Sequence, residues 1–375
     1  MKPPTRFMSR RRKVIRHILA GALVTAVVAS ASAATWRIAG PYPSGTWASL
    51  DATDRAMFTE LSAQYERAAA DPAQVWTEDF HYEDQPFLLL RTTKAQSIDW
   101  KYAFLVNMSD VVDTSSMRRV SLPNMPLLDD VRVSKAFSFT EPWLHLPANF
   151  TDAEFNGTPV IAFKFHPGMF NTDGSEEKDF RHFSAHENFH LAVQGIDPTA
   201  ADSWKYDDAG YLDPVPTSSE HERLLRAELV ALDQAREATD VAAARTAAAD
   251  AVRLRLLRQE TWPELSKQDG IETIEGTATY FEAKINGDDA LVGAPSLIAV
   301  IDHFGDSVLG RDLYYWTGSS IAVTLDTLQP GWKDSLSSSA ASGNGPTLFE
   351  MLRQATGVME APPAIAVDDL VNAYT

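Results

Sequence analysis

His186, Glu187 and His190 have the residue types and the spacing of a metal-dependent catalytic site. Residues four apart lie one turn apart on the same face of an α-helix, so both imidazoles can bind one metal ion. Glu187 directly follows the first histidine and can accept a proton from a water molecule at the metal. The pattern His-Glu-x-x-His therefore predicts a zinc-dependent hydrolase with His186 and His190 as ligands and Glu187 as general base.

The flanking sequence predicts that this motif lies on one helix, from about residue 176 to residue 194. Asp173 and Ser175 are candidate N-caps, and Gly195 is the expected C-terminal stop. His182 would share the face of the two motif histidines and competes as a ligand. The pattern favours the second pair, because it places a glutamate beside it.

A second stretch with three carboxylates supplies the rest of the predicted site. A zinc site with two histidines needs a third protein ligand, and a glutamate on a second helix is a common solution. Glu275 is favoured, and Gly276 after it would let this helix pack closely on the first. Glu282 shares the face of Glu275 and could hydrogen-bond a ligand histidine to fix its orientation. Glu272 lies one turn earlier, near the site, and is the alternative ligand.

The order of these motifs resembles that of a known family. Glu275-Gly-x-Ala-x-Tyr-x-Glu282 after a His-Glu-x-x-His helix is similar to the gluzincin metallopeptidases, the superfamily that includes the aminopeptidase N type. The resemblance covers roughly residues 158–330 and implies that Glu275 is the third zinc ligand and that Glu282 supports the site.

The family also carries a Tyr-x-x-Gly motif whose tyrosine hydrogen-bonds the tetrahedral intermediate. Tyr315-Trp-Thr-Gly318 matches it here, which implies that Tyr315 stabilises the oxyanion, whereas Tyr314 is one residue out of register. Two departures limit the resemblance. Glu275 follows His190 by 85 residues, a gap that an inserted helical stretch explains, and no Gly-x-Met-Glu-Asn segment is present. Aminopeptidase specificity is therefore not implied.

Residues 1–33 have the features of a secretory signal peptide. Seven basic residues and no acidic ones lie in residues 2–16, an apolar run follows from residue 18 to 31, and Ala31-Ser32-Ala33 is a small-x-small cleavage signature. The apolar run is shorter than the about 20 residues that a membrane span needs. We expect cleavage and export to the periplasm or the medium, without stable membrane insertion; an uncleaved anchor is the alternative.

The composition of the chain limits which partners it is expected to bind and which residue types can hold a metal ion. The chain of 375 residues has a net charge of −18, and loss of the seven basic leader residues would take it to −25. So acidic a protein is not expected to bind nucleic acid. There are no cysteines, so histidine and carboxylate must hold any metal, as in catalytic zinc sites.

The predicted fold class is α+β, with a mixed supporting region at 34–150 and a mostly helical, zincin-like catalytic domain at 151–375. An edge strand at 158–165 would precede the motif helix and pair with an extended substrate; an interior strand is the alternative. A helical insertion is expected at 217–262. The other predicted elements are a helix at 51–70, strands at 86–91 and 102–106, a flexible loop at 335–345, and short helices at 348–356 and 367–374.

Taken together, these features predict a secreted zinc metallopeptidase acting on a peptide or protein substrate. Two alternatives remain open. One is a non-catalytic, zinc-containing binding protein, against which the intact Glu187 argues, because such a protein needs no general base. The other is a metal-dependent amidase or esterase acting on a non-peptide substrate.

Overall fold

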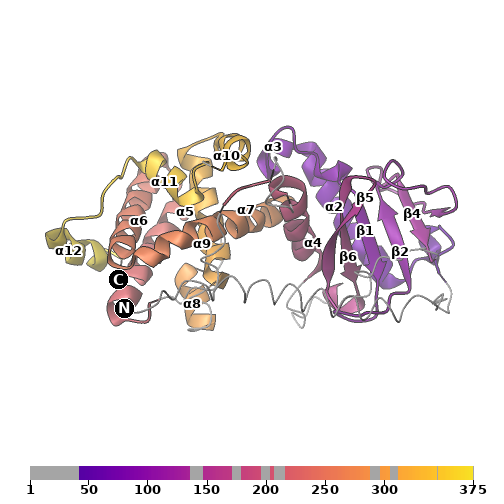
Figure 1. Ribbon diagram of the computed structural model, residues 1–375, viewed down its shortest axis with the longest axis horizontal. Helices are drawn as coiled ribbons and strands as arrows, with labels where there is room; N and C mark the ends of the chain where they lie inside the picture. The colour runs from indigo at the N-terminus through magenta and orange to yellow at the C-terminus, as the bar shows by residue number, and fades with distance from the viewer. Residues whose placement is uncertain are drawn as a thin grey trace, which may run out of the picture.

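The computed structural model describes residues 42–135, 147–170, 179–195, 203–206, 216–287, 296–304, 311–343 and 345–374. The predicted signal peptide and the candidate caps Asp173 and Ser175 lie outside these ranges. The fold is α+β, as predicted, with a mixed sheet at one end of an elongated molecule and helices at the other (Figure 1). In the described ranges, no helix combines the length and the apolar character needed to cross a membrane.

The strands are β1 (Phe87–Arg91), β2 (Tyr102–Val106), β3 (Arg118–Arg119), β4 (Val131–Ser134), β5 (Phe150–Phe155) and β6 (Thr158–Phe165). The α-helices are α2 (Ala52–Ala70), α3 (Pro72–Val75), α4 (Phe180–Phe189), α5 (Ser219–Glu237), α6 (Val241–Thr261), α7 (Asp269–Asn286), α8 (Leu297–Phe304), α9 (Arg311–Leu328), α10 (Trp332–Ala340), α11 (Leu348–Thr356) and α12 (Val367–Asn372). A π-helical turn, η5 (His190–Gln194), continues α4. Short 3-10 helices are η1 (Trp47–Ser49), η2 (Tyr82–Asp84), η4 (Pro167–Phe170), η7 (Pro263–Gln268) and η10 (Ala364–Ala366).

The sheet has the order β3-β4-β2-β1-β6-β5, and only the pair β1–β6 is parallel. The prediction that residues 158–165 form an edge strand is therefore wrong: β6 is interior, and β5 is the end strand. The two are joined by Asn156 and Gly157, which both have positive φ, as a two-residue hairpin turn requires. The sheet also combines strands from both sides of the predicted domain boundary at residue 150.

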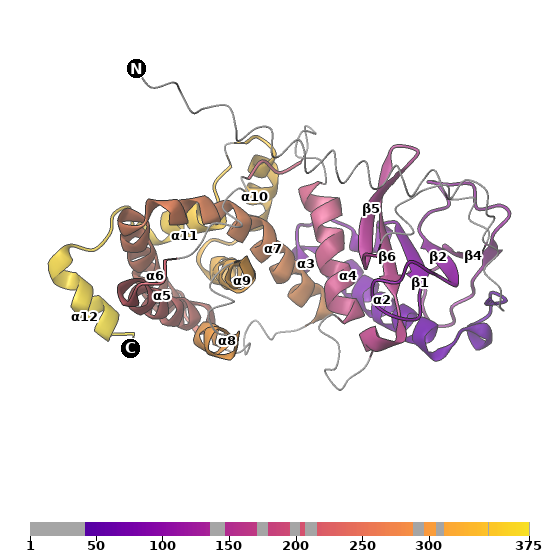
Figure 2. The same cartoon turned by 60° about the horizontal axis from the view of Figure 1, so that its bottom comes forward.

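Helices α2 and α4 cover one face of this sheet (Figure 2). The Phe163 ring of β6 lies 5.5 Å from the Phe180 ring and 5.3 Å from the Phe183 ring of α4. Helix α4 begins at Phe180, later than predicted, because Asp179 accepts a hydrogen bond from the backbone N–H of His182 at 2.9 Å and caps the first turn. Gly195, with φ of 78°, follows the last helical residue, as predicted.

The helical character predicted for residues 217–262 is confirmed: they form the hairpin α5–α6, whose helices are capped by Ser218 and Asp240. Its inner face holds a buried ion network that reaches the next helix. Arg255 of α6 pairs with Glu228 of α5 and with Glu272 of α7, and Thr317 of α9 donates to the same Glu272 carboxylate. Burial opposes ionisation of Glu228, but Arg258 and Arg255, which both pair with its carboxylate, outweigh this effect and lower its pKa. The network therefore ties four helices together.

Helices α7 and α9 touch backbone to backbone at two glycines. A Cβ on Gly276 would lie 2.4 Å from Cα of Gly318, and a Cβ on Gly318 would lie 2.3 Å from the carbonyl oxygen of Glu272. The sequence predicted that Gly276 would allow close packing on the motif helix, which is wrong, because its close neighbour belongs to α9. The contact instead brings α9, which carries Tyr315, next to α7, which carries Glu275.

The predicted loop at 335–345 is wrong over its first half, where the chain forms α10. Trp332 and Leu336, one turn apart, are fully buried, and the Trp332 indole N–H donates to Asp326 at 2.9 Å. Tertiary packing thus overrides the low helix propensity of a serine-rich segment. The predicted helices at 51–70 and 348–356 and the strands at 86–91 and 102–106 are confirmed within one residue at each end, whereas the helix predicted at 367–374 ends at Asn372.

Candidate metal centre

Two helices bring three potential metal ligands to one point. His186 lies on α4, His190 opens the π turn that continues it, and Glu275 lies on α7, which packs on α4 (Figure 2). The Nε2 atoms of the two histidines are 3.0 Å apart. Oε2 of Glu275 lies 3.2 Å from Nε2 of His186 and 3.3 Å from Nε2 of His190. In the described ranges, this is the one group of histidine and acidic side chains with the spacing of a metal site.

The remaining ring nitrogen of each histidine has its own hydrogen-bond partner. Nδ1 of His186 lies 3.0 Å from the Glu282 carboxylate, which can only accept, so this nitrogen carries the proton. Nδ1 of His190 lies 2.6 Å from Oε1 of Gln194. The Gln194 amide nitrogen donates to the carbonyl oxygen of Ile274 at 2.8 Å, which fixes the orientation of the amide. Both imidazoles are therefore held as the Nδ1–H tautomer.

This arrangement leaves three electron-rich atoms facing one another. Two Nε2 lone pairs and one carboxylate oxygen converge without a hydrogen between them, which is repulsive unless a cation lies among them. A tetrahedral zinc ion with bonds of about 2.0–2.1 Å separates its ligand atoms by about 3.3 Å. The three observed separations of 3.0, 3.2 and 3.3 Å fit that value. The donor set of the described residues thus matches a divalent cation such as Zn²⁺.

In the metal-free protein, protons take the place of the cation. Burial would lower the pKa of His186, but hydrogen bonds with Glu275 and Glu282 outweigh it and raise this pKa to about 10. Burial likewise opposes ionisation of Glu275, yet the two histidines hold the pKa of Glu275 well below its usual range. A metal ion and a proton compete for the same His186 lone pair, so metal binding releases a proton and weakens as the pH falls.

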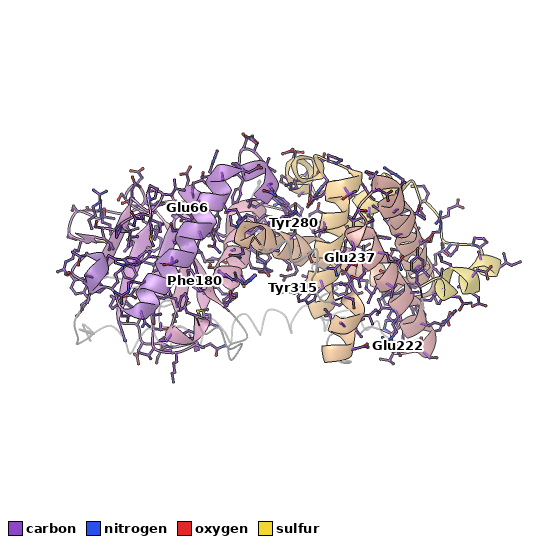
Figure 3. The ribbon with its side chains drawn as sticks, turned by 180° about the vertical axis from the view of Figure 1, so that it is seen from behind. Glu66, Phe180, Glu222, Glu237, Tyr280 and Tyr315 are labelled. Atoms are coloured by element: carbon purple, nitrogen blue, oxygen red, sulfur yellow. The ribbon has the colours of Figure 1, made fainter. Side chains whose placement is uncertain are left out.

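Glu187 and Tyr315, the two predicted catalytic residues, also lie at this centre. Glu187 is half-buried beside His186 on α4, and its charge contributes to the raised pKa of His186. The half-buried Tyr315 ring stacks on the His186 ring, with centroids 5.5 Å apart and planes 14° apart. Figure 3 shows Tyr315 between the sheet-containing half, with Glu66 and Phe180, and the helical half, with Glu237.

Three sequence candidates fall outside this group. Glu272, the predicted alternative ligand near the site, instead accepts hydrogen bonds from Arg255 and Thr317 in the buried ion network. Tyr314 lines a small cavity together with Glu272 and Arg255, apart from the converging ligands. His182 has its ring nitrogens 3.9 Å from Asp179 and 3.9 Å from Glu282, and is not among the converging ligands.

Gln194 is a site residue that the sequence analysis missed. It lies four residues after His190, the helical spacing that brings two side chains together, so the signal was present in the sequence. Its amide also donates to the Thr277 hydroxyl at 2.9 Å, which links the end of the motif helix to α7 two residues from Glu275. Gln194 therefore orients His190, one of the three potential ligands, and joins the motif helix to α7.

Replacing Gln194 by alanine is expected to weaken zinc binding by about 10–100-fold, the usual effect of losing a group that orients a ligand histidine. Competition with a chromogenic zinc chelator measures this affinity. Gln268→Ala is the matched control, because it removes another buried glutamine, the last residue of η7, which lines the small cavity with Glu272 and Tyr314. Equal zinc affinity in both variants would contradict the orienting role of Gln194.

In comparisons with known proteins, no family model, no curated protein and no solved structure matches this chain.

Proposed function

We propose that the chain is a zinc metallopeptidase of zincin-like fold that hydrolyses peptide bonds after export from the cytoplasm. One observation carries the proposal: the convergence of His186, His190 and Glu275, with both other imidazole nitrogens already hydrogen-bonded. Glu187 beside this centre and the succession of motifs in the sequence support peptide hydrolysis. The signal-peptide features of residues 1–33 support export.

His186, His190 and Glu275 would hold the zinc ion, which leaves a coordination position for water or substrate. Bound zinc supplies a Lewis acid that acidifies water and polarises a carbonyl group. Glu187 accepts the proton of the attacking water and passes it to the leaving amine, which is general acid–base catalysis by one carboxylate. The hydroxyl group of Tyr315 donates a hydrogen bond to the oxyanion as it forms.

The arrangement favours a catalytic over a purely structural metal site. Structural zinc sites in proteins are closed by four protein ligands, commonly with cysteine among them. The group described here has three ligands and no cysteine, and the His190 side chain remains 26% exposed. The carboxylate of Glu187 next to His186 gives such an open site its base.

A protease assay with controlled metal content tests the proposal. The purified mature protein is expected to cleave casein or a quenched fluorescent peptide mixture, to lose this activity with a zinc chelator, and to regain it when zinc is added. Metal analysis should find one zinc per chain. Stoichiometric zinc without cleavage of any peptide would favour a binding protein or a hydrolase of non-peptide substrates, and absence of bound zinc would overturn the proposal.

A further inference from the structure

The end strand of the sheet carries a carboxylate on the same face as the motif helix. Phe150, Asp152 and Glu154 alternate along β5 and therefore lie on one face of the sheet. Asp152 pairs in register with Ile161 of β6, and Ile161 belongs to the core on the side covered by α2 and α4. Directly paired side chains lie on the same side of a sheet, so Asp152 faces α4.

The position of Asp152 along α4 follows from one aromatic contact. The rings of Phe150 and Phe183 lie 5.4 Å apart. Because α4 starts at the carboxyl end of β6 and η5 packs back against β6, α4 and β5 run in the same direction. Two strand residues advance about 6.6 Å, the rise of four to five helical residues. Asp152 is therefore level with Glu187, between the metal ligands.

The electrostatic setting of Asp152 agrees with this position. Its side chain is exposed to water, yet surrounding protein raises its pKa by desolvation, and His190 partly offsets this effect. The influence of the His190 charge on this pKa indicates that Asp152 lies near the metal centre. Among the described strands, none pairs with the outer edge of β5, so an extended chain can lie along it beside the metal centre.

We propose that Asp152 selects peptides with a positively charged group next to the scissile bond, either a lysine or arginine side chain or a free α-amino group. The proposal rests on the proposed peptidase function and specifies its substrate class. A cationic group of the substrate beside Asp152 would form a charge-assisted hydrogen bond with its carboxylate. A substrate carboxylate at the same position would be repelled by Asp152.

Paired peptide substrates test this inference. An N-acetylated peptide mixture, digested and read by mass spectrometry, first locates the cleavage sites. Quenched peptides of one sequence, with lysine or glutamine next to the cleaved bond and with acetylated or free N-termini, then give kcat/KM. We expect the cationic peptide to exceed the neutral one by at least about tenfold, as for one hydrogen bond to a charged group. Added salt should reduce the ratio.

Asp152→Asn should lower this ratio to about one, whereas the matched variant Glu154→Gln, on the same strand and face, should retain it. Zinc content and melting temperature verify that both variants fold. A preference confined to free N-termini assigns the cation to the α-amino group, and one that survives acetylation assigns it to the side chain. Equal ratios in the wild type and Asp152→Asn overturn the inference alone, because cleavage persists. No peptide cleavage at all overturns the proposed function as well.

Discussion

Replacing Glu187 by glutamine is expected to lower kcat for peptide hydrolysis by about 10²–10⁴-fold, the usual contribution of a positioned general base. Glutamine keeps the size and the hydrogen-bonding shape of the side chain but cannot take up the proton. Zinc should remain bound, because His186, His190 and Glu275 are untouched. The measurement is kcat on a quenched peptide, together with the zinc content of the same sample.

The control for this substitution is Glu66→Gln on α2, an exposed glutamate in the sheet-containing half, away from Tyr315 (Figure 3). It makes the same chemical change and should leave kcat within twofold or so of the wild type. Full activity in Glu187→Gln would contradict the assignment of the base. Loss of zinc from that variant would show instead that Glu187 supports the metal site.

The second large effect concerns the metal itself. His186→Ala should abolish stoichiometric zinc binding, because it removes one of three ligands and leaves the Glu282 carboxylate without its imidazole partner. His182→Ala, four residues earlier on the same helix, is the matched control and should retain one zinc per chain. Zinc content by atomic absorption distinguishes the two variants.

The effect of zinc on the melting temperature provides a second test with His186→Ala and His182→Ala. A ligand that binds only the folded state stabilises it by about 2.7 kcal/mol at a free concentration of 100 times Kd. Zinc should therefore raise the melting temperature of the wild type and of His182→Ala, and leave that of His186→Ala unchanged. A zinc-dependent shift that persists in His186→Ala would place the metal elsewhere.

The ligand helix was predictable because its signals are local. His186 and His190 have the spacing of one helix face, Glu187 directly follows the first of them, and Gly195 ends the helix at the predicted residue. The choice between Glu275 and Glu272 was harder, because they lie one turn apart on one helix face. The structure separates them through Arg255, a residue of α6 that pairs with Glu272. No local pattern in the sequence reveals such a partner.

Other features depended on packing that sequence periodicity does not show. Strand β5 has phenylalanine only at its two ends and mostly polar residues between them, so it was not recognised as a strand and β6 was taken for the edge. The Asn156-Gly157 pair was the available turn signal. Helix α10 forms because Trp332 and Leu336 are buried, although serines dominate its sequence. The charge of Asp152 became relevant only once the strand order was known.

The contact between Gly276 and Gly318 has a consequence for motion. No side chain separates the two backbones at this point, so any side chain added at either glycine would push α7 and α9 apart. The contact therefore fixes how closely Tyr315 on α9 approaches Glu275 on α7, whereas His186 belongs to the sheet-covering helix. If α4 and α7 moved apart, the Glu275 carboxylate and the Tyr315 phenol would leave the imidazoles together, so the proposed metal ligand and the proposed oxyanion donor would be lost in a single event.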